Sequence, residues 1–356
     1  MIAVAVLPGD GVGPEVIAGP SALLAELSTR GVLTFTGPWP IGTTGFAETG
    51  HRTPAETLAA CEASDAILLG AVGDHPGIDE KSYPGLAARA GSALGDLREL
   101  FDLRVSIRKI WRGDAVPFTV VRNLLGGAYG GRVMRRESVD GSPAGDVLEL
   151  EPDRIREVAH IAADYVEATG AQFISADKAS LLATSRLWRR VASGVAEERR
   201  LPVRHVYVDR MAFELAAAPP PEAVLLTEGI FGDMLSDAAC GRAGSIALAG
   251  SASVRPPTPN NTHRCIGLFE PVHGSAPLHA GANRVNPIGG YLALAALLDW
   301  FPETRVWAQP IRGAVARVLA EGPLTYDMTP QGSHPATTTD VSEHINDVFA
   351  VAAAEL

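Results

Sequence analysis

Two aspartates four residues apart, Asp233 and Asp237, lie in the segment Phe231–Asp237. On a helix this spacing places both carboxylates on one face, where they repel each other unless a cation lies between them. Carboxylate oxygens suit Mg²⁺ or Mn²⁺. A third acid, Asp209, ends the strand-like run His205–Asp209, and strand ends are where α/β sheets place ligands. The sequence therefore predicts a divalent-cation site. The alternative is a solvated helix face that carries two acids.

Several basic and phenolic side chains are candidates for substrate chemistry. Arg98, Arg108 and Arg122 are candidate carboxylate clamps, because a guanidinium offers two parallel donors to a carboxylate. Lys178 follows a strand-like run and Tyr129 lies in a glycine-rich turn, so either could take part in proton transfer. Each has a plainer interpretation: a surface ion pair for an arginine, a surface position for the lysine, and a half-packed ring for the tyrosine.

A glycine-rich turn, Gly9-x-Gly11-x-Gly13, follows the first apolar run. It does not match the GxGxxG pattern of dinucleotide-binding domains, because Pro14 occupies the sixth position. Pro14 suits the first turn of a helix. We therefore interpret the segment as a tight strand-to-helix turn and do not predict a Rossmann domain.

Short apolar runs alternate with helical patterns along the chain, which predicts an α/β fold with a largely parallel sheet. The segment 132–150 alternates weakly and contains Gly and Asp, so we expect a hairpin arm there. The expected strands are Ile2–Leu7, Ala66–Leu69, Phe118–Val121, Gln172–Ser175, Val203–Val208 and Ala223–Leu226, and the expected helices are Pro14–Leu27, Arg154–Ala168, Leu292–Leu298 and Val341–Ala354.

The composition narrows the class of protein. A chain of 356 residues predicts two domains, and a net charge of −11 argues against nucleic acid as a partner. The three cysteines lack metal-ligand or CxxC spacing, so a reducing compartment is expected. The N-terminus does not resemble a signal peptide and no apolar stretch is long enough to span a membrane. These features predict a cytoplasmic protein.

Long motifs in a fixed order carry a resemblance over nearly the whole chain. The chain resembles the β-decarboxylating dehydrogenase family of isocitrate and isopropylmalate dehydrogenases, and most of all its isopropylmalate branch. The motifs are LPGDGVGPEV at 7–16, VRNLLGGAYGG at 121–131, DKASLLATSRLW at 177–188, TEGIFGDMLSD at 227–237, EPVHGSAP at 270–277 and NPIG at 286–289.

The resemblance implies two α/β domains with a cleft between them and a β-hairpin arm, and not a Rossmann fold. The first domain would comprise residues 1–97 and 246–356 and hold the adenosine end of the cofactor. The second would comprise residues 98–245 and carry the dimer interface. The protein would be a homodimer with shared active sites, because Lys178 and Asp209 would come from the partner subunit.

The resemblance also implies the reaction and the roles of the site residues. A 3-substituted malate would be oxidised at C2 by NAD(P) and decarboxylated to a 2-oxo acid and CO₂. Tyr129 and Lys178 would be catalytic. Asp209, Asp233 and Asp237 would hold Mg²⁺ or Mn²⁺. The substrate would contact Arg98, Arg108, Arg122, Leu94 and Leu181, and the cofactor would contact Gly70, Val72, Glu270, His273, Gly274, Ser275, Ala276, Leu278, His279 and Asn286.

Some positions depart from the family pattern. Leu278, which is followed by His279, stands where an aspartate of the family selects NAD, so NAD is favoured and NADP stays open. The pocket for the C3 substituent carries a glutamate and two apolar residues in the isopropylmalate branch, and here these positions are Gly91, Leu94 and Gly95, which predicts an altered substituent. Ser180 and Gly229 each replace an asparagine.

Other readings follow from these departures. D-malate, tartrate or isocitrate are alternative substrates of the same reaction class, and Arg104 or Arg112 could bind an additional charge. A catalytically silent paralogue that binds a metabolite is the alternative from another class of protein. The presence of Tyr129, Lys178 and the aspartates argues against it.

Overall fold

A computed structural model describes residues 1–73, 93–111, 117–129, 134–136, 143–218, 221–256, 264–354 and 356. The chain divides into two compact units. The first comprises Met1–Leu97, Gly244–Ala252 and Pro259–Leu356, and the second comprises Arg98–Ala243 and Ser253–Thr258. The short segment after Ala252 belongs to the second unit because Val254 O accepts the Arg104 amide at 3.0 Å.

The sheet of the first unit has the strand order β2-β1-β3-β12-β11, with the pairs β2-β1, β1-β3 and β3-β12 parallel. Every residue of the central strand β3 is buried, as expected for a strand covered on both faces. The strands are β1 (Ile2–Gly9), β2 (Leu33–Thr36), β3 (Ala66–Ala71), β11 (Ala249–Val254) and β12 (Gly267–Pro271).

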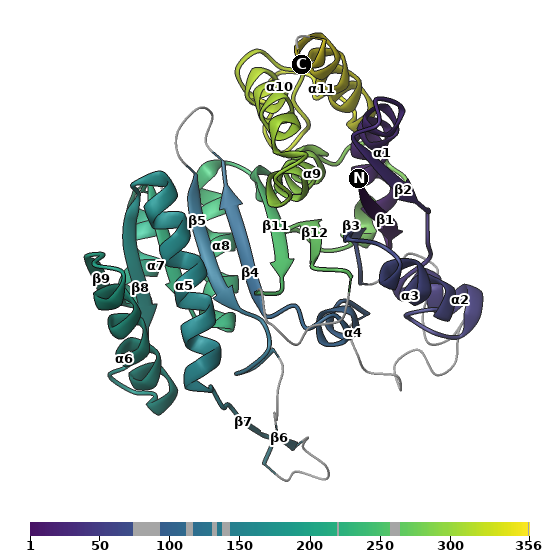
Figure 1. Ribbon diagram of the computed structural model, residues 1–356. Coiled ribbons are helices and arrows are strands. Elements are labelled where there is room, and N and C mark those ends of the chain that lie inside the picture. Colours follow the sequence, from purple (N-terminus) through teal and green to yellow (C-terminus); the bar gives the residue numbers. More distant parts are fainter. Residues whose placement is uncertain are drawn as a thin grey trace. The chain divides into compact units, whose positions relative to one another are not determined.

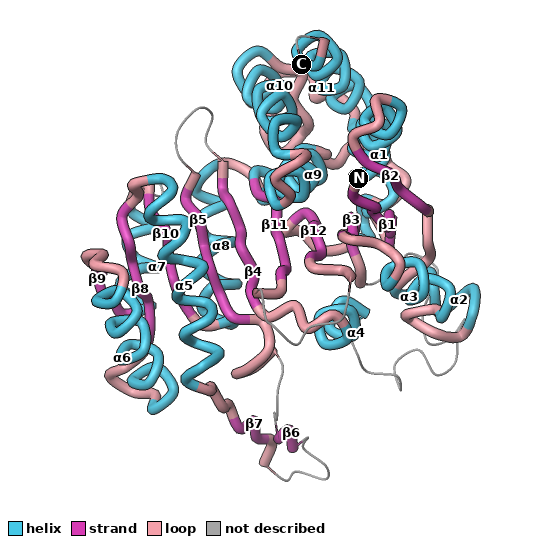
Figure 2. Tube along the Cα trace, in the orientation of Figure 1, coloured by secondary structure: helices cyan, strands magenta, loops and turns pink. Residues whose placement is uncertain are grey.

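The helices of the first unit bring the two ends of the chain together. α1 packs on the last helix, α11, and on α9, while α10 packs on α9 and α11 (Figure 1). Both chain ends lie in this unit (Figure 2). α9 is buried along most of its length. The helices are α1 (Gly13–Thr29), α2 (Gly42–Thr49), α3 (Ala55–Glu62), α9 (Ile288–Trp300), α10 (Ala308–Glu321) and α11 (Thr338–Ala353).

The second unit has the strand order β4-β5-β10-β8-β9, in which β4 and β5 are antiparallel and the other pairs are parallel. Helices α5 and α6 cover one face, and α7 and α8 cover the other (Figure 1). The strands are β4 (Val105–Ile110), β5 (Phe118–Asn123), β8 (Gln172–Asp177), β9 (Val203–Tyr207) and β10 (Ala223–Thr227). The helices are α5 (Pro152–Thr169), α6 (Ala183–Glu198), α7 (Val208–Ala217) and α8 (Gly229–Ala243), and α4 (Ala93–Leu100) contains the division between the units.

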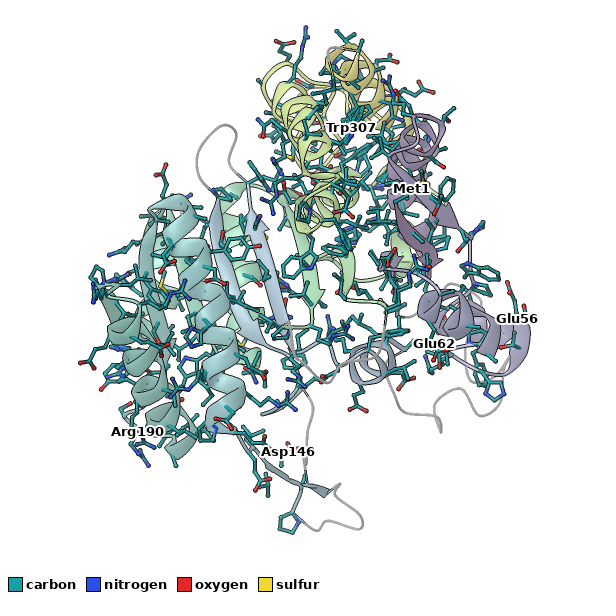
Figure 3. All side chains as sticks on the ribbon, in the orientation of Figure 1. Met1, Glu56, Glu62, Asp146, Arg190 and Trp307 are labelled. Atoms are coloured by element: carbon teal, nitrogen blue, oxygen red, sulfur yellow. The ribbon has the colours of Figure 1, made fainter. Side chains whose placement is uncertain are left out.

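The arm expected within 132–150 is present as a short antiparallel pair. β6 (Met134–Arg136) pairs with β7 (Gly145–Val147), and Met134 lies opposite Val147. Figure 3 shows Asp146 on this arm, away from the sheet of the second unit. Residues 132–133 and 137–142, which also belong to the expected arm, lie outside the described residues.

The expected strands and helices are confirmed, most of them extended by one to four residues at an end. One boundary was wrong. The strand-like run was expected to continue to Asp209, but β9 ends at Tyr207 and Asp209 lies in the first turn of α7. An acidic side chain at this position is stabilised by the unpaired amides at the start of the helix. The valines before Asp209 favour a strand, so the sequence pattern did not indicate that a helix begins there.

The structure also bears on the predictions about the cysteines and about membrane-spanning segments. Cys61, Cys240 and Cys265 are buried and form no disulfide. Among the described residues, no helix has the length and apolar character needed to cross a membrane.

Candidate active site

Two arginines on neighbouring strands of the second unit point to the same face of the sheet. β4 and β5 are antiparallel, with Ser106 opposite Arg122. Arg108 lies two residues after Ser106, so its side chain shares the face of Arg122. Helix α8 packs on β4 and β5, and it carries Asp233 and Asp237. Strand pairing therefore places two guanidiniums against the helix that presents the two acids.

The four side chains form one cluster of opposite charges. Asp233 Oδ1 lies 2.9 Å from Arg122 Nη2 and 3.0 Å from Arg108 Nη2. Asp237 Oδ1 lies 3.2 Å from Arg108 Nη1. Arg122 is 1% exposed and also donates to Gly229 O at 2.9 Å. The expectation that Asp233 and Asp237 share one helix face is confirmed by their common contact with Arg108.

The cluster shifts the pKa values of its members in opposite directions. Burial and the neighbouring charge of Arg108 lower the pKa of Arg122 to about 10. Burial alone would raise the pKa of Asp233, but Arg122 and Arg108 hold it below its usual value. Burial and the repulsion from Asp233 raise the pKa of Asp237. Asp237 is thus the carboxylate whose charge the cluster compensates least, and a divalent cation bound between the two aspartates would offset the repulsion from Asp233.

Tyr129 joins this cluster from the glycine-rich turn after β5. Its hydroxyl donates to Asp233 Oδ2 at 2.9 Å, and the Arg122 guanidinium lies 5.1 Å from the centre of its ring. Gly229 makes room for the ring, because a Cβ there would lie 2.7 Å from Tyr129 Cδ2. Burial and the charge of Asp233 raise the pKa of Tyr129. The phenol therefore stays protonated at neutral pH and can donate a proton.

Arg98 belongs to the same electrostatic environment, since its charge lowers the pKa values of both Asp233 and Arg122. Arg104 does not. It forms ion pairs with Asp102 and, at 2.8 Å, with Glu157. The suggestion that Arg104 supplies a cation for a charged substrate stays a prediction, and these two carboxylates would compete with such a substrate for its guanidinium. Arg112, the other candidate, lies outside the described residues.

Lys178 and Asp209 form a second charged group in the second unit. Lys178 Nζ lies 2.6 Å from Asp209 Oδ1, and this hydrogen bond lowers the pKa of Asp209. In the described part of the chain, no three His, Cys, Asp or Glu side chains gather as a metal site. Within one protein chain, Asp233 and Asp237 therefore lie together, whereas Asp209 does not join them. The metal set of three aspartates stays a prediction, which a second copy would have to complete.

The first unit contains a buried carboxylate that sequence reasoning missed. Asp10 is fully buried and lies in the turn between β1 and α1. Its side chain accepts the amides of Thr43 at 3.0 Å, Thr44 at 2.8 Å and Gly73 at 3.0 Å. The Thr44 hydroxyl adds a bond of 2.9 Å. One carboxylate therefore joins the loop after β1, the start of α2 and the loop after β3.

The glycines of this turn allow the loops to approach each other. Gly11 has φ +58°, and a Cβ there would lie 2.0 Å from Ser275 O. The Val12 amide donates to the same oxygen at 2.8 Å. Gly70 is equally restricted, since its Cβ would lie 2.3 Å from Pro8 O, and half-buried Val72 follows at the end of β3. The expected cofactor residues around 70 and 275 thus meet at the glycine turn.

The segment 270–286 provides the other side chains expected to contact the cofactor. Glu270 and Ser275 are buried and Gly274 is exposed. His273 Nε2 is buried without a hydrogen-bond partner in the described part of the chain, and burial lowers the pKa of this histidine. A buried ring nitrogen without a partner among the described residues is suited to a hydrogen bond with a bound ligand. These residues fit a nucleotide cofactor.

Two further features of this segment concern the adenosine end. Asn286 is fixed at both ends of its amide, because Nδ2 donates to Asp327 at 3.1 Å and Oδ1 accepts the Ile288 amide at 3.1 Å. Ala276 adopts a left-handed conformation with φ 39° immediately before Pro277–His279. Leu278 is consequently 95% exposed. An exposed leucine at this position can offer a ribose neither a hydrogen bond nor a charge.

The two apolar side chains expected at the substrate differ in exposure. Leu94 is half-buried on α4, whereas Leu181 is 70% exposed in the turn after Lys178. Gly91 lies outside the described residues. Nothing within the described copy covers Leu181, as expected for a side chain that contacts a substrate or a second copy.

The family model described as isocitrate/isopropylmalate dehydrogenase matches residues 3–345. The chain is 35% identical to a 3-isopropylmalate dehydrogenase of Geobacillus kaustophilus over 96% of this chain and 94% of that protein. A 3-isopropylmalate dehydrogenase of Shouchella clausii is 36% identical over 98% and 97%. A β-decarboxylating dehydrogenase from Thermococcus kodakarensis has a similar structure, with a TM-score of 0.78, 32% identity and coverage of 99% and 98%.

The protein is therefore an oxidoreductase of the β-decarboxylating dehydrogenase class, which uses a nicotinamide cofactor. More narrowly, the chain belongs to the isocitrate/isopropylmalate dehydrogenase family. The fold agrees with this assignment: an isocitrate dehydrogenase from Methylococcus capsulatus, 24% identical, has a TM-score of 0.82 over 98% of this chain and 99% of its own.

Glu228, next to the cluster, provides a test of its electrostatics. Burial raises the pKa of Glu228, although amides including that of Phe231, at 3.2 Å, oppose the shift. Because the pKa of Glu228 is higher in the folded state than in the unfolded state, folding favours its neutral carboxyl group. This contribution to the stability of the folded state is complete in acid and is lost as the pH rises through the folded pKa. Glu228→Gln should therefore raise the melting temperature at pH 7 by about 2–4 °C and leave it unchanged below about pH 4. Exposed Glu222→Gln is the control. Equal melting at pH 7 would contradict the argument.

Proposed function

We propose that the protein catalyses the metal- and NAD-dependent oxidative decarboxylation of 3-isopropylmalate or a close 3-substituted malate, giving a 2-oxo acid and CO₂. The observation that carries the proposal is the cluster of Arg108, Arg122, Asp233, Asp237 and Tyr129. It combines anion-binding guanidiniums, a pair of carboxylates suited to a divalent cation and a protonated phenol. A dicarboxylic 2-hydroxy acid needs all three kinds of group.

Each residue of the cluster has a distinct role in this reaction. Arg108 and Arg122, with Arg98, hold the substrate carboxylates through charge-assisted hydrogen bonds. Their side chains are confined by the sheet and by α8, so they are already oriented before the substrate binds. Lys178 accepts the proton of the 2-hydroxyl, directly or through a neighbour. Tyr129 protonates C3 after CO₂ departs.

The aspartates define the expected metal site. Asp233 and Asp237, together with Asp209 of a second copy, would bind Mg²⁺ or Mn²⁺, which supplies Lewis acidity at the oxygen of the substrate that is oxidised. In the described copy, Arg108 and Arg122 neutralise Asp233. A cation on the aspartates would take over that neutralisation and leave both guanidiniums available to the carboxylates of the substrate.

The identity of the C3 substituent is the open part of the proposal. Gly91 and Gly95 have no side chain to contact an isopropyl group, so a substituent of different size or polarity is the variant we favour testing. A third carboxylate, as in isocitrate, is less well supported because Arg104 is neutralised by Asp102 and Glu157. D-malate and tartrate, which carry no additional charge, stay within the reaction class.

A panel of malates that differ only at C3 tests the function. Purified protein with Mn²⁺ and NAD should produce reduced nicotinamide and CO₂ with one or more of them, and Lys178→Met should lower kcat about 10²–10⁴-fold, the contribution of a general base. If 3-isopropylmalate is turned over rapidly, Gly91 and Gly95 are tolerated variation and the altered-pocket hypothesis fails. Absence of turnover with every malate would refute the proposed reaction.

The cofactor preference depends on the exposed side chain of Leu278. We propose NAD as the main cofactor, with NADP tolerated because no carboxylate stands at this position and Arg284 is near in sequence. Leu278→Asp should raise the ratio of kcat/KM for NAD to that for NADP at least tenfold, about 1.4 kcal/mol, since a carboxylate repels the 2′-phosphate. The uncharged control Leu278→Asn should change the ratio much less. An unchanged ratio in Leu278→Asp would place the discrimination elsewhere.

We propose that the active enzyme is a homodimer in which Lys178 and Asp209 serve the other copy's cluster. Exposed apolar side chains on α7 and α8 support this, with Phe213 60% and Met234 70% exposed, because such patches mark interfaces.

Mixing two inactive variants tests the shared site. After joint refolding, Lys178→Met and Asp233→Asn subunits should recover about a quarter of the wild-type activity, because half of the dimers are mixed and each has one intact site. Each variant refolded alone is the control. No recovery would mean that Lys178 acts within its own copy.

A further inference from the structure

Two arginines of α6 hold the turn that carries Lys178. Arg189 Nε donates to Asp177 Oδ2 at 2.8 Å, and Arg189 Nη2 donates to Asp177 Oδ1 at 2.9 Å. Arg186 Nη1 donates to the carbonyl oxygens of Ala179 at 3.2 Å and Leu181 at 3.4 Å. The side chain of Asp177 is 1% exposed. A buried carboxylate of this kind requires the two-pronged partner that Arg189 provides.

The same carboxylate fixes the backbone on the C-terminal side of Lys178. Asp177 Oδ1 accepts the Ala179 amide at 2.8 Å. The Leu181 and Leu182 amides both donate to Lys178 O at 2.9 Å. The main chain of Lys178 is therefore restrained by hydrogen bonds before and after it, and only its side chain is left to move.

Arg189 also reaches the strand that leads to Asp209. Its guanidinium lies 5.0 Å from the centre of the Tyr207 ring. Tyr207 is the register partner of Asp177 in the parallel pair of β8 and β9, and it lies two residues before Asp209. Arg189 thus contacts the residue that precedes Lys178 and a residue next to the helix start that carries Asp209. Lys178 and Asp209 are the pair joined at 2.6 Å.

The other groups that face Arg189 come from α6 and β9. The Ser193 hydroxyl donates to Arg189 O at 2.8 Å and lies 2.8 Å from His205 Nε2. Burial, and next the charge of Arg189, lower the pKa of His205. His205 is consequently neutral at pH 7, and Arg189 is the cation that balances Asp177 in this cluster.

We propose that Arg189 is a positioning residue: through Asp177 and Tyr207 it holds Lys178 and Asp209 as one oriented pair. The proposal rests on the role of Lys178 in the proposed function. A long lysine side chain has many rotamers, and proton transfer requires a narrow range of distances. A buried ion pair beneath the turn fixes the point from which that side chain extends.

The first test replaces Arg189 by Gln and compares it with Arg190→Gln. Arg190 is exposed on the same helix (Figure 3). Arg189→Gln should lower kcat about 10–100-fold, as losses of supporting contacts do, with KM for the malate within about twofold. The limb of the pH profile of kcat that reports Lys178 should shift. Arg190→Gln should match the wild type. Unchanged kcat and pH profile in Arg189→Gln would overturn the proposal.

A double variant separates positioning from stability. Arg189→Gln leaves Asp177 buried and unpaired, so the melting temperature should fall. Adding Asp177→Asn removes that charge and should restore the melting temperature, while kcat and the pH profile stay altered because the two-pronged contact is still missing. Recovery of kcat together with the melting temperature would show a purely structural role and overturn the proposal.

A labelling experiment keeps this test independent of the reaction. The sequence contains no lysine besides Lys81, Lys109 and Lys178. Competitive acetylation, followed by peptide mass spectrometry, measures the reactivity of Lys178 with Lys109 as the internal reference. Arg189→Gln should change the relative reactivity at least about threefold, and Arg190→Gln should not. If the wild type is inert on every malate but the labelling changes as expected, the proposed function fails and the positioning stands. Identical labelling in both variants would overturn the positioning.

Discussion

Two guanidiniums share one carboxylate oxygen of Asp233, and much of the second unit is arranged around that contact. Arg122 is almost completely buried, and a buried cation requires a paired anion. The antiparallel pairing of β4 and β5 supplies both arginines to one face, and α8 supplies the anion. The positive and negative charges of this cluster already balance. A divalent cation could therefore replace the arginines as partner of the aspartates, and the carboxylates of a substrate could replace the aspartates as partners of the arginines. The cluster is therefore stable before ligands bind and suited to binding them.

In the first unit, a buried carboxylate holds together loops that follow different strands. The buried carboxylate of Asp10 accepts main-chain amides from the loops at 43, 44 and 73. Of these residues Thr43 is buried, so its amide would otherwise be an unsatisfied buried donor. Gly11 then allows the loop at Ser275 to approach within contact. A nucleotide needs several main-chain segments at once, and one carboxylate fixes their spacing.

The departures from the family pattern fall at places where packing tolerates or requires them. Gly229 accepts the ring of Tyr129, because any Cβ there would overlap it. The change from asparagine thus accompanies the contact of the phenol with Asp233. The side chain of Leu278 is exposed to solvent after the left-handed Ala276. A leucine in place of the aspartate of the family therefore changes the stability of the folded state little. Neither of these two departures removes a member of the charged cluster.

The sequence was sufficient to predict the helices and strands and the family of the chain. It was also sufficient to identify the candidate arginines, aspartates, lysine and tyrosine, because periodicity, spacing and motif order are local properties of the chain. It also predicted the shared helix face of Asp233 and Asp237, which depends on a spacing of four residues. The tertiary structure alone decided that Arg104 is neutralised by Asp102 and Glu157, that Asp10 joins three loops, and that Arg189 supports the turn of Lys178. These contacts link residues up to 63 positions apart, and a buried charge selects its partner by proximity in the folded chain, which no local pattern records.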